Sequence, residues 1–320
     1  MSTLAIVHPT DLLGVELRES LERRRDLWDE MRLLSTLEDE IGSLTEVRGE
    51  AAMVTKIEAG SLSGVDVAFF SAEMGANHSL LSQVPEATAA VLLSPDAGAN
   101  DGLPIVAGVN LDRATRETTL VSPHPATVLL AHLLYPLRGF DLGRVAATVL
   151  QPVSMVGKAG LDEMLGQTRS ILSFDNDPPR DIFPFQMVFN TVPATTSKSS
   201  LEQQLGTVLD SPASVSIDLL QAGIFHGFGA SVYIELGEDP GPDTVRRALA
   251  EHPVNELSDS PETLGPIDAA ASDKVLVGNV EAVNEGEGCY RVWAVMDNLT
   301  CGGAANAIQI LEAISSQVMH

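Results

Sequence analysis

The chain has 320 residues, of which 44% are hydrophobic, and its 44 acidic and 19 basic residues give a formal net charge of −25. This excess of negative charge argues against partners such as nucleic acid or an anionic membrane, because phosphate contacts need clustered Lys and Arg. No apolar run reaches the roughly 20 residues of a membrane-spanning helix, and two cysteines are too few for a disulfide framework or a four-cysteine zinc site.

The first 125 residues alternate apolar strands with helical patterns. Thr3–His8 is a continuous apolar run with no basic region before it, so we expect a first buried strand rather than a signal peptide. Residues 11–25 then place Leu13, Leu17 and Leu21 at helical spacing. Further strands are expected at Met31–Ser35, Val65–Ser71, Ala89–Leu93, Pro104–Val109 and Thr119–Val121. Such alternation predicts an α/β fold with a doubly wound parallel sheet.

Beyond residue 125 the pattern changes to that of an α+β domain with a mixed or antiparallel sheet. A helix is expected over Ala126–Leu137, and a second one over Gly302–Val318. Longer strands are expected at Val145–Val153, Val215–Ala222 and Ser231–Leu236. An antiparallel pair is expected at Lys274–Val283 and Tyr290–Met296, around the turn Asn284–Gly288. Polar loops are expected at Gly237–Pro242 and Asn255–Pro266.

Three segments resemble those of one enzyme family. Phe183–Pro193 matches the Phe-Pro-x-Gln-x-x-Phe-Asn-x-x-Pro stretch of aspartate-semialdehyde dehydrogenases, and Leu150–Lys158 matches their Gln-x-Val-Ser-x-x-Gly loop. Met296–Ile310 is similar to their Asp-Asn-Leu sequence, which precedes Gly-Ala and a helix bearing Gln-Ile. The chain most resembles the Usg-type paralogues of this family, which lack the catalytic cysteine and carry Gln where the enzymes have Arg.

The resemblance implies a fold, an assembly and a reaction. Residues 1–125 with the C-terminal helix 302–320 would form a Rossmann-like, dinucleotide-binding-like domain, and residues 126–301 a dimerisation and substrate-like domain. The protein would be a homodimer. Active members reduce an acyl phosphate to a semialdehyde with NADPH, through a thioester, in amino-acid biosynthesis.

The positions that match the catalytic residues carry unsuitable side chains. Pro125 stands at the position of the nucleophilic cysteine in the segment Ser122–Thr127, and a proline ring cannot attack a carbonyl. Gln221 replaces the substrate-binding arginine, and a neutral amide does not clamp a carboxylate as a guanidinium does. Phe228 stands at the position of the acid–base histidine and cannot move a proton. We therefore expect no intact catalytic site.

A residual pocket between the domains would be lined by His124, Gln151, His226 and Asn298. Each also has a simpler interpretation, as a turn histidine or as a buried amide that satisfies backbone atoms. His124 would also be the base nearest to Ser122 or Thr127, if a hydroxyl replaced the thiol.

The loop expected to hold the cofactor is altered as well. The family has Gly-x-x-Gly-x-x-Gly, whereas the loop His8–Gly14 keeps only its last glycine. Pro9 lacks an N–H donor, and Asp11 would place negative charge where phosphates would lie. A plain turn capped by Thr10 or Asp11 is the alternative.

Thr10, Gly14 and Ser35 are the positions that match the remainder of the cofactor site. The acidic Glu38 and Asp39 follow Ser35 and would repel the 2′-phosphate of NADP, although a carboxylate there could hold the free 2′-hydroxyl of NAD. We expect no cofactor, with NAD or NADP as the alternative, and no metal.

These losses together favour a catalytically impaired homologue with a binding, regulatory or partner-subunit role. It would be cytoplasmic and would pair with itself or with an active paralogue. Two alternatives are an active NAD(P)-dependent oxidoreductase with altered chemistry, acting on an aldehyde, and a small-molecule sensor. The sequence leaves open whether the acidic surface reflects adaptation to salt.

Overall fold

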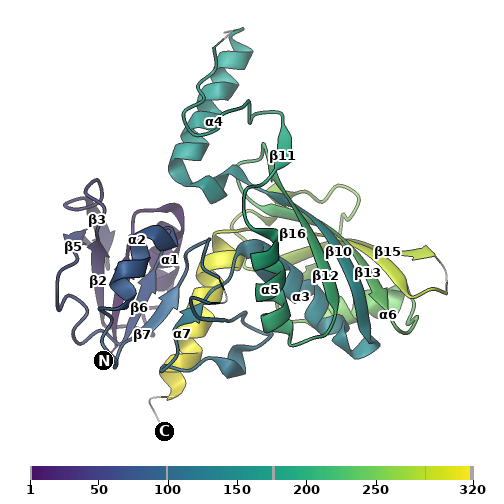
Figure 1. Cartoon of the computed structure of the whole chain (residues 1–320), viewed down its shortest axis with the longest axis horizontal. Helices are drawn as coiled ribbons and strands as arrows, with labels where there is room; N and C mark the ends of the chain where they lie inside the picture. Colours follow the sequence, from purple (N-terminus) through teal and green to yellow (C-terminus); the bar gives the residue numbers. More distant parts are fainter. Residues whose placement is uncertain (1, 99, 175–176, 285, 318–320) are drawn as a thin grey trace. The chain divides into compact units, whose positions relative to one another are not determined.

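The computed structural model describes residues 2–98, 100–174, 177–284 and 286–317. The chain divides into two compact units (Figure 1). The first contains the residues up to Pro125 together with the C-terminal segment from Gly302, and the second contains Ala126–Cys301. The C-terminal segment thus returns to the unit in which the chain begins.

In the described part of the chain, the N-terminal unit is built on a parallel seven-stranded sheet of order β5-β2-β1-β6-β7-β9-β8. Its strands are β1 (Thr3–Val7), β2 (Glu30–Ser35), β5 (Thr55–Lys56), β6 (Val67–Phe70), β7 (Ala89–Leu92), β8 (Leu103–Pro104) and β9 (Leu120–Val121). The chain runs outward from β1 to β2 and β5 and then returns to β6, so the strand order reverses between β1 and β6. The predicted doubly wound, Rossmann-like sheet is confirmed.

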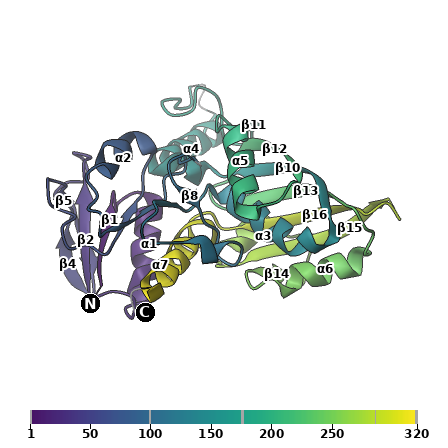
Figure 2. The same ribbon diagram turned by 60° about the horizontal axis from the view of Figure 1, so that its bottom comes forward.

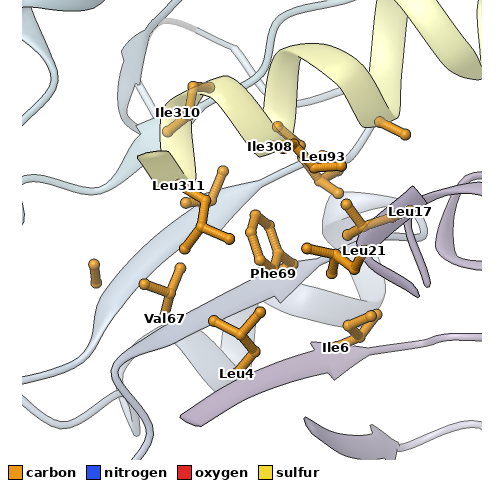
Figure 3. Packing of buried hydrophobic residues seen from close by; sticks show 14 of the residues in the cluster. Leu4, Ile6, Leu17, Leu21, Val67, Phe69, Leu93, Ile308, Ile310 and Leu311 are labelled. Atoms are coloured by element: carbon orange, nitrogen blue, oxygen red, sulfur yellow. The ribbon is translucent and has the colours of Figure 1, made fainter. Parts of the chain in front are cut away.

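Helices α1 (Leu12–Arg23) and α7 (Asn306–Ser316) lie side by side in this unit (Figure 2). Their apolar side chains pack on one face of the sheet, where Leu17 and Leu311 share a buried cluster with Phe69 (Figure 3). The next residue along β6, Phe70, belongs to a second buried cluster, which also contains Met74 of α2 (Met74–Leu81). Burial on both faces explains why the strands read as continuous apolar runs.

A hairpin that the sequence analysis did not predict follows β2. Strands β3 (Leu44–Val47) and β4 (Glu50–Met53) pair antiparallel across the two residues Arg48 and Gly49. Both turn residues have positive φ, of 56° and 79°, as a type I′ hairpin requires. The Arg48 guanidinium lies 4.2 Å from the centre of the Trp28 ring, which holds the hairpin against the unit.

The strand expected at Pro104–Val109 ends earlier than predicted, because the side chain of Asn110 folds the chain into a turn after β8. Its Oδ1 accepts a hydrogen bond from Val106 N at 2.8 Å, and its Nδ2 donates to Pro104 O at 2.9 Å. These bonds replace those that a neighbouring strand would supply.

The central unit contains, in its described residues, a mixed seven-stranded sheet of order β11-β12-β10-β13-β16-β15-β14. Its strands are β10 (Leu142–Gln151), β11 (Thr191–Pro193), β12 (Ser214–Ala222), β13 (Phe228–Leu236), β14 (Asn255–Leu257), β15 (Val275–Asn284) and β16 (Cys289–Met296). The pairs β10–β12 and β14–β15 are parallel and the other pairs are antiparallel. The expected mixed sheet and the β15–β16 hairpin are confirmed.

The α-helices among the described residues of this unit are α3 (Pro125–Leu134), which begins at the last residue of the first unit, α4 (Gly157–Leu172), α5 (Lys198–Leu209) and α6 (Pro242–Glu251). Figure 1 shows α5 along β12 and α4 extending away from the sheet. The expectation of a loop from Asn255 was wrong at its start, since Asn255 begins β14. Its side chain donates to the carbonyls of His132 and Leu249, which holds this edge strand beside α6.

The predicted C-terminal helix begins later than expected. A π-helical turn, Thr300–Ala305, comes first, and α7 starts at Asn306. Val318, its expected last residue, lies outside the described residues, as do Met1, Ala99 and the end of the predicted first domain at 319–320.

Asn306 provides a test of how α7 is attached to the sheet. Its Oδ1 accepts from Ala107 N at 2.8 Å, and its Nδ2 donates to Ile105 O at 3.0 Å and to Ser122 Oγ at 2.8 Å. Asn306→Leu leaves these buried groups unpaired, so we expect the free energy of unfolding in urea to fall by roughly 2–4 kcal/mol. Ser316→Ala, at the exposed end of the same helix, should cost less than about 0.5 kcal/mol. Equal effects of the two variants would contradict this role.

Candidate functional site

The turn between β9 and α3 carries the position expected for a nucleophile. Pro125 is the first residue of α3, and it is buried. A proline suits this position because its fixed φ and missing N–H cost nothing in the first turn of a helix. His124 before it is also buried, with 2% of its surface exposed. The expected strand, turn and helix are therefore present, and their helix starts with a residue that has no reactive side chain.

The two hydroxyls nearest to this position in the sequence are held by amides. Ser122 Oγ accepts from Asn306 Nδ2, and Thr127 Oγ1 donates to Gln204 Oε1 at 3.0 Å. A side-chain amide is not a base and does not activate a hydroxyl for attack.

Gln221, expected from the sequence to stand at the position of the family's arginine, is paired with a second glutamine. Gln151 and Gln221 are aligned in the parallel pair β10–β12, and each is 6% exposed. Gln151 Nε2 donates to Gln221 Oε1 at 2.8 Å, and Gln221 Nε2 donates to Gln151 O at 3.2 Å. The pair supplies no positive charge for an anionic substrate. Among the described residues, Gln151 Oε1 has no hydrogen-bond partner.

Asn298 joins two loops of the central unit. Its Oδ1 accepts from Ser154 Oγ at 3.2 Å and from Gly227 N at 3.1 Å, and the side chain is 1% exposed. The neighbouring Asp297 accepts from the amides of Leu299 and Thr300. The Asp-Asn-Leu segment thus stabilises its own turn, which favours the structural interpretation of Asn298.

Phe228 and His226 lie in different environments. Phe228 starts β13 and is fully buried, whereas His226 is exposed in the preceding loop. Gly227 between them has φ of +85°, and a Cβ there would lie 2.6 Å from Pro266 O. The loop therefore needs glycine at this point, and His226 does not share the buried position of Phe228.

Both cysteines lie in the central unit, in environments that do not favour a nucleophile. Cys301 is buried, and this burial, together with Asp273 and Asp297, raises the pKa of its thiol to about 12. It stays protonated at neutral pH, and a protonated thiol is a poor nucleophile. Cys289 is buried in β16. The described residues contain no group of three or more His, Cys, Asp or Glu placed to hold a metal ion.

The positions that match the cofactor site lie close together after β1 and β2. His8 Nδ1 and Ser35 Oγ are 3.0 Å apart, and Thr10 Oγ1 donates to Glu40 Oε1 at 2.5 Å. Asp11, rather than Thr10, caps α1, with Oδ1 accepting from Gly14 N at 2.5 Å. Glu40 was not predicted from the sequence, because no motif marks a carboxylate that reaches this loop from beyond the second strand.

The Phe183–Pro193 segment has a structural role that the sequence analysis also missed. Glu163 of α4 accepts from the amides of Ile182 and Phe183, at 2.6 and 2.9 Å. Gln167, one turn later, accepts from Met187 N at 2.7 Å. Two buried polar side chains thus hold the segment along α4. This packing role explains the sequence pattern of the segment, and no role in the candidate site is needed.

Comparisons with known proteins agree with this architecture. Residues 134–301 match the family model described as the semialdehyde dehydrogenase dimerisation domain. The chain is 30% identical to a USG-1 protein homolog of Azotobacter vinelandii, over 98% of both proteins. It is 26% identical to an aspartate-semialdehyde dehydrogenase of Bacillus subtilis, over 97% of this chain and 96% of that protein.

Solved structures show the same fold. Aspartate-semialdehyde dehydrogenase II of Vibrio cholerae, complexed with ASA, superposes with a TM-score of 0.90 at 24% identity, over 99% of this chain and 98% of that one. The enzyme of Candida albicans with NADP gives a TM-score of 0.75 at 16% identity, over the full length of both chains. Among the described residues, no helix has the length and apolar character needed to span a bilayer. The chain belongs to the aspartate-semialdehyde dehydrogenase family, in which it is similar both to proteins named as the dehydrogenase and to a USG-1 homologue.

Proposed function

We propose that this chain is a catalytically impaired member of its family, with a binding, regulatory or partner-subunit role. The observation that carries the proposal is Pro125, which occupies the first position of α3, at the turn where the family's thiolate is expected. The covalent step needs a nucleophile on that residue, and proline has none.

The loss of the substrate clamp and of the acid–base group supports the same proposal. Gln221 forms a neutral pair with Gln151, so an acyl phosphate would find no guanidinium there. Phe228 is buried in an apolar position and exchanges no proton. Cys301, with its raised pKa, is a poor substitute nucleophile.

We also propose that the protein is a dimer through the surface around α4. The central unit matches a dimerisation domain. Large apolar side chains are exposed on α4 and in the segment that follows it: Leu165, Leu172, Phe174, Ile182 and Phe189. Exposed apolar patches of this kind mark interaction sites on soluble domains. A second copy of this chain is the proposed occupant, and a mixed dimer with an active paralogue would use the same surface.

Activity assays test the proposed impairment. With aspartate semialdehyde, phosphate and either NADP⁺ or NAD⁺, we expect turnover at least about ten-thousand-fold below that of the Bacillus subtilis enzyme, because the covalent route is lost. Formation of reduced cofactor, followed at 340 nm, measures it. Purified protein with turnover within tenfold of that enzyme would contradict the proposal and favour an active oxidoreductase with altered chemistry.

The α4 surface is tested by placing charge on it. Phe174 is 91% and Phe189 72% exposed, so Phe174→Asp with Phe189→Asp should leave folding intact and raise the dimer dissociation constant at least about tenfold. Analytical ultracentrifugation measures this change. Ile267→Asp is the matched control, since Ile267 is 83% exposed on the same unit and outside this surface. The proposal fails if wild-type protein is monomeric at micromolar concentration, or if the control dissociates equally.

Co-expression with an active paralogue tests the mixed dimer separately. Native mass spectrometry of differently tagged subunits should give mixed dimers that the Phe174→Asp and Phe189→Asp substitutions remove. Homodimers alone at every expression ratio would refute the partner-subunit role.

A further inference from the structure

The crevice that receives a dinucleotide in a doubly wound sheet is fixed by topology. Ligands bind outside the carboxyl ends of the strands where the strand order reverses, and the pyrophosphate lies on amides at the start of the first helix. In this chain the order reverses between β1 and β6, and the first helix is α1. The residues that follow β1 and β6 are therefore those that would have to hold the phosphates.

One carboxylate already binds the amides on both sides of this crevice. Asp11, after β1, accepts from Gly14 N through Oδ1 at 2.5 Å and from Ala72 N, after β6, through Oδ2 at 2.8 Å. It is also the N-cap of α1, where a negative charge interacts favourably with the helix dipole. A phosphate at this place would compete with Asp11 for the same donors and would be repelled by its charge.

Gly14 is required by this closed turn itself. A Cβ at Gly14 would lie 2.7 Å from His8 O and 2.9 Å from Asp11 Oδ1. These contacts with the chain's own atoms are sufficient to explain the glycine. Its presence therefore does not indicate that a pyrophosphate approaches the loop.

A second carboxylate closes the side of the loop that faces β2. Glu40 is 6% exposed, and its Oε1 accepts from Thr10. Its Oε2 lies 3.5 Å from Nδ1 of His8, a fully buried residue with φ of +62°. Ser71 after β6 donates to His8 O at 2.6 Å, which holds the backbone in this unusual conformation.

The second helix of the unit repeats the arrangement. Met74 N, at the start of α2, donates to Asp96 Oδ1 at 2.8 Å. One amide at the start of each helix, Gly14 N of α1 and Met74 N of α2, is thus bound to a carboxylate of the chain. The groups in the crevice do not fit a dinucleotide, whose phosphates would add at least two negative charges beside three carboxylates.

We propose that the N-terminal unit closes its own phosphate site, with the carboxylate of Asp11 in the place of a pyrophosphate and Glu40 as a second barrier. The unit accordingly binds neither NADH nor NADPH. Cofactor binding is separate from the proposed loss of the nucleophile, since a chain without a thiolate could still hold NADPH.

Calorimetric titration with NADH, NADPH and inorganic pyrophosphate tests the inference. We expect dissociation constants above about 1 mM for the wild-type protein. Asp11→Gly combined with Glu40→Gln should bind NADPH or pyrophosphate at least about tenfold more tightly, because two amides are freed and two charges are removed. Gly costs a helix cap only a few tenths of a kcal/mol relative to Asp. Should the double variant not fold, Asp11→Asn removes one charge and retains a capping oxygen.

The matched control is Glu86→Gln with Glu117→Gln, which removes two charges from exposed positions before β7 and β9, at the amino ends of the strands. It should leave the affinities unchanged. Micromolar binding by the wild-type protein would overturn the inference, and so would a gain in the control equal to that in the variant at Asp11 and Glu40. Neither result would bear on the proposed loss of catalysis, because neither supplies a nucleophile. That proposal is tested separately by the turnover assay.

Discussion

The hydrogen bonds from Gly14 N and Ala72 N to the carboxylate of Asp11 connect the two halves of the parallel sheet where its strand order reverses. A dinucleotide would make this connection in an active dehydrogenase of this fold, and we propose that here an internal contact takes the place of the ligand. Gly14 N and Ala72 N are thus bonded without a ligand. The backbone of His8, with its positive φ, is supported by the hydrogen bond that Ser71 donates to its carbonyl. In the proposed account, these two hydrogen bonds both stabilise the unit and close its cofactor site.

In the central unit, buried polar side chains are likewise bonded to other groups of the chain. Gln221 is bound to Gln151, Thr127 is bound to Gln204, and Asn298 is bound to the loops on either side. Buried polar groups need partners, and here the partners are mostly the chain's own side chains. In the proposed assignment of the site, neutral amides and an aromatic ring stand where charged groups would bind an anionic substrate and move its protons. The proposed function is consistent with this pattern, since a scaffold can retain its assembly when its chemistry is lost.

Much of the fold could be predicted from the sequence, because strands buried on both faces, such as β1 and β6, give continuous apolar runs. The β3–β4 hairpin could not, since its short strands are half exposed and its turn residue Arg48 is not a typical one for positive φ. The structural roles of Asn110 and Asn255 could not be predicted either. Each fixes its loop or edge strand through specific hydrogen bonds, and those bonds depend on where the side chain lies in the folded chain.

Only part of the candidate site could be predicted, because some of its contacts also depend on the folded chain. The proline at position 125 and the carboxylate at position 11 can be recognised in the sequence, because they stand where a thiolate and a phosphate-binding loop are expected. Glu40 reaches Thr10 from 30 residues further along, and Ala72 reaches Asp11 from 61 residues away. Contacts of this range are set by the order of the strands in the sheet, and no local pattern encodes them.

A crystal structure of the protein grown with millimolar NADPH tests the central claim most directly. We predict that Asp11 still accepts hydrogen bonds from Gly14 N and Ala72 N, and that no pyrophosphate density appears at the start of α1. A pyrophosphate bound to Gly14 N, with the carboxylate of Asp11 turned away, would contradict the claim.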